Sequence, residues 1–144
     1  MLKKIQILLI VFFCSHLSQS FALEDFYEEG IKKYNDKKLE DAKFLFQRSI
    51  IFHPKDAKSY LYLAKIYNSE KNQKEEEKNI NTVLLLDPKN EEAVYMLMNI
   101  ELIKSNYSEV RRYLIIFSSI CKNLCEKEKL ILKSLKNLEP KNES

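Results

Sequence analysis

The chain has 144 residues, of which 45% are hydrophobic and 31% are charged, and its formal net charge is +3. Its single glycine excludes the glycine-rich loops that cradle phosphates and dinucleotides, and its three prolines leave little turn chemistry for a β-rich fold. This composition favours one all-helical globular domain, and the small net charge gives no reason to expect a nucleic-acid partner.

The first 22 residues have the layout of a secretory signal peptide. Lys3 and Lys4 precede an apolar run from Ile5 to Cys14, and the segment ends in a small-x-small cleavage sequence, Ser20-Phe21-Ala22. Cleavage after Ala22 would leave 122 residues with 22 basic and 21 acidic side chains, so the net charge would be +1. We therefore predict an exported protein, located in the periplasm or the cell envelope.

Two alternatives to cleavage of the leader would attach the protein to a membrane. It could be retained as an anchor, although its apolar core is shorter than the roughly 20 residues that a transmembrane helix needs. Cys14 could be lipid-modified, but Phe13 stands where bacterial lipoprotein signals have a small residue. Membrane attachment is expected only if the leader is retained or lipidated.

The spacing of apolar residues predicts six helices after the leader. Asn, Asp and Ser stand between them, and their short side chains favour turns because they compete for backbone hydrogen bonds. Pro54 and Pro88 each end a helix, while Asp56 and Asn90 are placed as amino-terminal caps. The predicted helices are residues 24–35, 39–52, 57–69, 73–86, 91–104 and 107–120.

The side-chain pattern repeats at a fixed interval along the chain. Pro54 and Pro88 are separated by about 34 residues, the length of one known helix-turn-helix repeat unit. Small residues that let helices approach closely stand at Gly30, Ala42 and Ala64. A shift by the same interval preserves the apolar class at Phe26, Tyr60 and Val94 in the first helices, and at Phe46, Ile80 and Leu114 in the second helices.

Together these residues resemble the tetratricopeptide repeat (TPR) family over about residues 23–120. The first unit matches best, whereas the third lacks the closing proline and has bulky residues at the close-packing positions. The resemblance implies an all-α fold, a right-handed α-solenoid of about three TPR repeats with a C-terminal capping helix.

The end of the chain predicts that capping helix. Leu130, Ile131, Leu135 and Leu138 recur at helical spacing among lysines, as in an amphipathic helix that covers the last repeat. The predicted boundaries are a signal peptide at 1–22, a TPR domain at 23–138 and a disordered tail at 139–144. Within the domain, the repeats are at about 23–56, 57–90 and 91–124, and the capping helix is at about 126–138.

The resemblance places the partner-binding groove on the first helix of each repeat. Such a groove would be aromatic and aliphatic, suited to an extended segment or a helix of a protein or peptide partner. Lys65 would pair with an acidic group, and Asn68 and Asn99 would bond to the partner's backbone. The predicted groove residues are Tyr27, Ile31 and Tyr34, then Leu61, Lys65 and Asn68, then Tyr95, Asn99 and Leu102.

Two considerations limit this prediction. Aromatic residues at helical spacing are often core residues, so Tyr27 and Tyr95 could only brace helix contacts. One variant of the family binds acidic chaperone tails through a clamp of lysine, arginine and asparagine. Because Tyr27 and Ile31 stand on that face of the first unit, we do not expect this chain to bind such tails.

Cys121 and Cys125 have the spacing Cys-x3-Cys between the last repeat and the capping helix. The favoured interpretation is two small apolar residues that face the core, because free cysteine is often buried. The alternative is a disulfide, which an exported protein can form. A disulfide would need a helix break near residues 122–124, because this spacing within one helix gives poor disulfide geometry.

No catalytic, metal or cofactor site is predicted. His53 is the only histidine outside the leader and stands beside a helix-ending proline, and the adjacent Glu75, Glu76 and Glu77 fan apart on a helix. The function that we predict is a non-catalytic protein- or peptide-binding scaffold outside the cytoplasm. The alternative is a structural subunit of a bacterial cell-envelope assembly, which is membrane-attached if the leader stays.

Overall fold

A computed structural model of the protein describes residues 26–138. The predicted leader at 1–22 and the predicted tail at 139–144 lie outside this part. The chain forms two compact units, Met1–Ser59 and Tyr60–Ser144, which we describe separately. Residues 26–138 consist of helices and short turns and contain no strand.

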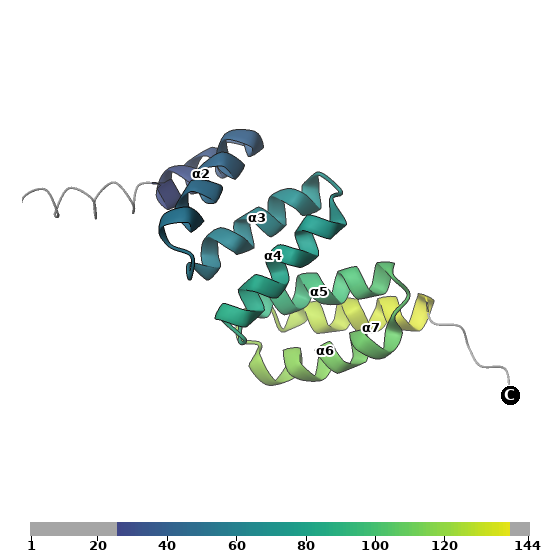
Figure 1. Cartoon of the computed structure of the whole chain (residues 1–144). Coiled ribbons are helices and arrows are strands. Elements are labelled where there is room, and N and C mark those ends of the chain that lie inside the picture. Colours follow the sequence, from purple (N-terminus) through teal and green to yellow (C-terminus); the bar gives the residue numbers. More distant parts are fainter. Residues whose placement is uncertain (1–25, 139–144) are drawn as a thin grey trace, which may run out of the picture. The chain divides into compact units, whose positions relative to one another are not determined.

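The described residues form seven helices, and the capping helix is among them (Figure 1). Predicted and observed helix ends agree within one residue wherever the structure describes them. Apolar periodicity and turn residues therefore determine the elements. The helices are residues 26–35, α2 (Leu39–Phe52), α3 (Ala57–Ser69), α4 (Gln73–Leu86), α5 (Glu91–Ile103), α6 (Tyr107–Ile120) and α7 (Glu126–Leu138).

The sequence repeat is visible in the backbone of three turns. Lys37, Lys71 and Ser105 have positive φ angles of 61°, 58° and 57°. A residue with left-handed geometry just after a helix is usually glycine. None of these three residues is glycine, so this geometry could not be predicted from the sequence. Each turn is closed by a backbone hydrogen bond of 2.9 Å, from the N–H of Lys38 to Lys33, of Asn72 to Tyr67 and of Asn106 to Glu101.

The two predicted caps are present. Asp56 Oδ2 accepts from the backbone N–H of Ser59 at 3.2 Å, and Asn90 Oδ1 accepts from that of Ala93 at 3.0 Å. Each cap satisfies a helix N–H that has no partner within the helix. Together with the prolines, these side chains explain why α3 and α5 begin where they do.

In the first unit, the helix over residues 26–35 packs against Phe46 of α2. A Cβ atom at Gly30 would lie only 2.8 Å from Phe46 Cε1. The Phe46 ring has no exposed surface, and Ser49 and Ser59 share a buried hydrogen bond of 3.0 Å. The only glycine of the chain is therefore needed for close helix approach.

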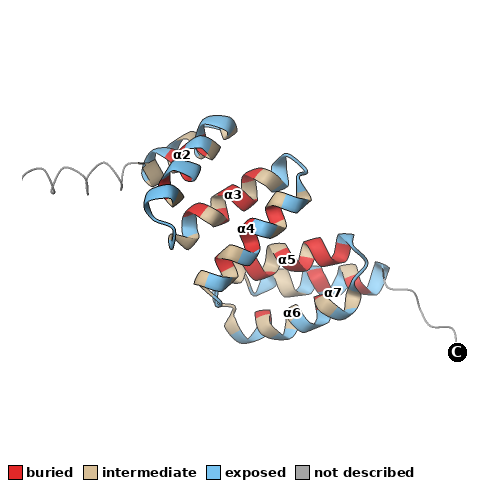
Figure 2. Ribbon diagram, in the orientation of Figure 1, coloured by how far each residue is buried: buried red, intermediate tan, exposed pale blue. Residues whose placement is uncertain are grey.

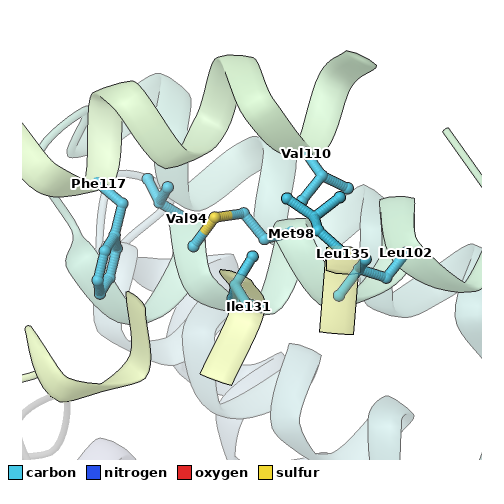
Figure 3. Packing of buried hydrophobic residues seen from close by; sticks show 7 residues of the cluster. All are labelled: Val94, Met98, Leu102, Val110, Phe117, Ile131 and Leu135. Carbon is cyan, nitrogen blue, oxygen red and sulfur yellow. The ribbon is translucent and has the colours of Figure 1, made fainter. Parts of the chain in front are cut away.

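In the second unit, α5 is the central helix and contacts α4, α6 and α7. Buried residues occur along most of α5 (Figure 2). Figure 3 shows side chains of α5, α6 and α7 meeting in one cluster, with Ile131 and Leu135 of α7 among them. This C-terminal cluster consists of Val94, Met98, Leu102, Val110, Phe117, Ile131 and Leu135.

Candidate protein-binding surface

Three predicted groove residues, Tyr27, Ile31 and Tyr34, lie in the first unit and are partly exposed. The Tyr27 ring packs 6.0 Å from the Phe46 ring, centroid to centroid, and Lys58 Nζ lies 5.9 Å from its centre. Tyr27 thus contributes to packing within the unit as well as to its surface.

The predicted groove residues of α3 are Leu61, Lys65 and Asn68, spaced by three and four residues along one helix face. Lys65 Nζ pairs with Glu92 Oε1 of α5 at 2.8 Å. Asn68 Nδ2 donates to Glu76 Oε1 of α4 at 2.9 Å. Both polar side chains therefore already have partners within the second unit.

Glu76 is a buried carboxylate that sequence reasoning missed. It occupies the repeat position of the buried Ala42, one unit later, and it is 5% exposed. Burial raises the pKa of Glu76, the hydrogen bond from Asn68 lowers it, and the charge of Glu77 raises it further. Asn68 is therefore the hydrogen-bond donor that makes burial of this group tolerable.

Leu102, like Leu61, is a largely buried residue of the predicted groove. It is 8% exposed and lies in the C-terminal cluster with Ile131 and Leu135 of α7. Since α7 packs along α5, the aliphatic side chain of Leu102 is removed from water by the protein itself.

Tyr95 and Asn99 lie on the same helix and are partly exposed. The Tyr95 ring packs 6.5 Å from the Phe117 ring, centroid to centroid, and Lys127 Nζ lies 5.8 Å from its centre. Asn99 Nδ2 donates to the backbone oxygen of Tyr95 at 2.9 Å. In the third repeat, the predicted groove residues thus serve contacts within the unit.

An open pocket of about 410 Å³ remains beside Leu61 in the second unit. It lies between α3, the start of α5 and the segment that precedes α7. Its apolar lining comes from Leu61 and Leu124, while carboxylates outnumber lysines among the polar groups. The polar lining residues are Asp87, Lys89, Asn90, Glu91, Glu92 and Asn123.

Glu91 joins the start of α5 to the segment before α7. Its carboxylate accepts backbone N–H bonds from Lys122 at 2.8 Å and from Asn123 and Leu124 at 3.1 Å. The Lys122 bond is the largest cause that lowers the pKa of Glu91 from its ordinary 4.5 to about 2. This carboxylate therefore stays ionised at neutral pH and anchors residues 122–124.

Replacing Glu91 by glutamine is expected to lower the free energy of unfolding by about 1 kcal/mol at pH 7, because an uncharged amide accepts these bonds less strongly. The pKa is depressed in the folded state, so the contribution is complete above pH 4.5 and is lost as the pH falls towards 2. Urea titrations from pH 7 to pH 2 test this, with the exposed Glu29→Gln as control. A difference that does not shrink as the pH falls contradicts the charge-based explanation.

Cys121 and Cys125 form a disulfide, with their Cα atoms 5.3 Å apart. The favoured sequence interpretation, two unpaired core cysteines, is not the arrangement found, and Cys125 is exposed. The chain is non-helical between Ile120 and Glu126, as a bond between these cysteines requires. The disulfide therefore closes the same segment that Glu91 anchors.

A second pocket, of about 440 Å³, lies between α4 and the end of α5. Lys104 in its wall pairs with Glu77 at 2.7 Å and with the buried Glu101 at 3.2 Å. The Glu77 bond is the first cause that raises the pKa of Lys104. Because these charges compensate each other, this pocket offers no unpaired cation at Lys104.

Residues 26–138 hold no group of three His, Cys, Asp or Glu side chains that could bind a metal ion. In the same residues, no helix is both long enough and apolar enough to cross a membrane. His53 is exposed at the end of α2, where its backbone N–H donates to Ser49 at 2.7 Å. The position of His53 is thus that of a helix-terminal residue.

Comparisons with known proteins identify the fold. No protein-family model and no curated protein sequence matches the chain. The TPR domain of Arabidopsis OM64 superposes with a TM-score of 0.71 at 19% identity, covering 81% of this chain and 95% of that domain. The first TPR of Spaghetti (RPAP3), bound to an HSP90 peptide, gives 0.72 at 15% identity, covering 82% and 94%.

A bacterial structure is similar to the same degree. The Yersinia enterocolitica type III secretion chaperone SycD, in complex with a peptide of the translocator YopD, has a TM-score of 0.69 at 19% identity. That match covers 81% of this chain and 92% of SycD. At such identities, structural similarity establishes the fold alone. This chain therefore has the all-α fold of TPR domains.

Proposed function

We propose that this protein is a non-catalytic scaffold that binds a protein or peptide partner outside the cytoplasm. The observation that carries the proposal is the open pocket beside Leu61, on a helix face where the TPR resemblance places a binding groove. Two of the similar structures contain a bound peptide, from HSP90 and from YopD respectively. The signal-peptide layout of residues 1–22 supports the location.

The charges around this pocket indicate the chemistry of the partner. The charge of Lys65 is neutralised by Glu92. Of the other charged residues that line the pocket, Glu91 and Asp87 are negative and only Lys89 is positive. An acidic segment would meet repulsion here, because like charges that lose water repel more strongly. We therefore expect the bound segment to carry apolar residues with neutral or basic neighbours.

A structural subunit of a cell-envelope assembly is the second candidate, and one observation favours it. Ile51, Leu85 and Ile115 lie on α2, α4 and α6 and are 73%, 80% and 74% exposed. Ile51 and Leu85 occupy the same repeat position in successive units. Large exposed aliphatic side chains of this kind suit permanent packing against a larger protein.

Affinity capture from an envelope extract separates the two candidates. One variant, the groove variant, is Leu61→Ala with Leu124→Ala, which truncates the two apolar residues that line the pocket beside Leu61. The matched variant, Ile51→Ala with Leu85→Ala, truncates two exposed residues of the second helices. Mass spectrometry identifies the captured proteins, and circular dichroism checks that both variants stay helical.

If the protein is a scaffold, the groove variant should bind one discrete partner at least tenfold more weakly. This corresponds to a difference of about 1.4 kcal/mol in the binding free energy. The matched variant should then retain that partner. The reverse pattern supports the structural subunit. Equal capture by the protein and both variants contradicts both candidates.

A further inference from the structure

Helix α7 packs against the face of α5 that carries Tyr95 and Leu102, two of the predicted groove residues of the third repeat. Ile131 and Leu135, four residues apart, are 1% and 3% exposed in the C-terminal cluster. Figure 3 shows both side chains pointing into that cluster, with Met98 and Leu102 of α5 beside them. This face therefore accepts an amphipathic helix, and α7 shows which side-chain spacing fits.

The attachment of α7 is narrow. Ile131 and Leu135 are its only buried residues, while Leu130, Leu132 and Leu138 are 49%, 45% and 53% exposed. A 13-residue helix is marginal on its own in water, so α7 depends on its docking and on its connection to α6. The Tyr107 hydroxyl donates to the backbone oxygen of Leu138 at 2.9 Å, which adds one contact at the far end.

Two interactions stabilise the connection before α7. They are the Cys121–Cys125 disulfide and the hydrogen bonds to the Glu91 carboxylate. Residues 121–125 contain neither glycine nor proline, so this local sequence does not itself break a helix. Cys125 is exposed, which gives a reductant access to the disulfide. Reduction would free this segment to change conformation.

We propose that the disulfide is a redox-controlled latch on α7, and that the face uncovered on reduction binds a second amphipathic helix in trans. A dithiol donor supplies two electrons, the S–S bond breaks, and each sulfur takes one proton. The donor becomes a cyclic disulfide. The incoming helix carries two aliphatic side chains four residues apart, like Ile131 and Leu135.

This proposal goes beyond the partner proposed for the pocket beside Leu61. It concerns the face of α5 and α6 beneath α7, so either proposal can fail while the other holds. The structure itself supplies the probe, because a synthetic peptide of residues 126–138 has the sequence that fits this face.

The test compares the oxidised full chain with the chain reduced by dithiothreitol and with the Cys121→Ser, Cys125→Ser variant. Hydrogen exchange measures opening of α7, and α4 serves as the internal control. Fluorescence anisotropy measures binding of the labelled 126–138 peptide. The control peptide carries Ile131→Asp and Leu135→Asp, which remove the two side chains that dock.

We expect exchange in α7 to become at least tenfold faster on reduction and in the cysteine variant, with α4 unchanged. The reduced chain should bind the peptide at least tenfold more tightly than the oxidised chain, and the control peptide should not bind. A reduced chain that dimerises by exchanging α7 also supports the uncovering, with a second copy as helix donor.

Three results would overturn the proposal. Equal α7 exchange in all three forms means that the disulfide does not hold α7. Faster exchange throughout α4 to α7 means that reduction unfolds the unit and does not release one helix. Faster α7 exchange without peptide binding means that the uncovered face is not a binding surface.

Discussion

Replacing Phe117 by alanine is expected to lower the free energy of unfolding of the second unit by about 4 kcal/mol. The ring has no exposed surface, and it joins α6 to the cluster formed by α5 and α7. Truncation removes the buried ring area and leaves a cavity that three packed helices can fill only in part. Urea titration followed by circular dichroism measures the change.

Ile115 provides the matched control on the same helix. It is 74% exposed, so Ile115→Ala should change the free energy of unfolding by no more than about 0.5 kcal/mol. A similar effect of the two substitutions would contradict the explanation by burial in the C-terminal cluster.

Replacing Gly30 by leucine is expected to lower the free energy of unfolding of the first unit by about 3 kcal/mol. Even a single Cβ atom would come 2.8 Å from Phe46 Cε1, and the Phe46 ring has no exposed surface. Gly30→Ala should have a smaller effect, because alanine gains about 1 kcal/mol of helix propensity. Thermal and urea unfolding of both variants test this ranking.

Two further substitutions separate steric overlap from other causes. Glu29→Leu adds a leucine at the neighbouring exposed position and should be nearly neutral. Phe46→Leu destabilises alone but removes the clashing ring edge, so combined with Gly30→Ala it should show a favourable coupling. Additive effects of the two substitutions would contradict direct contact between these positions.

The helices and their ends could be predicted because their causes are local. Apolar spacing, proline at helix ends and the caps Asp56 and Asn90 act over a few residues. The gaps between the predicted helices also contain Lys37, Lys71 and Ser105, although the left-handed geometry of these three residues is not signalled by a glycine. The helices and turns can therefore be predicted without knowing which helices contact each other.

The roles of single surface residues could not be predicted in the same way. Lys65 and Asn68 share a helix face with Leu61, but their partners, Glu92 and Glu76, come from other helices. A repeat alignment predicts which helix face a side chain lies on, but it does not predict which residue of a neighbouring helix contacts that side chain. The prediction of surface roles was least accurate in the degenerate third repeat, because α7 covers Leu102 there.

The sequence by itself determined the helical elements, their repeat and the presence of an amphipathic helix at 126–138, since periodicity and capping are local properties. Only the tertiary structure decided that Glu91 binds residues 122–124, that Cys121 and Cys125 are joined, and that α7 takes the face of α5. The Glu91 and α7 contacts join segments that are distant in the sequence, and the two cysteines, four residues apart, meet because the chain leaves the helix between Ile120 and Glu126. All three depend on how the helices pack.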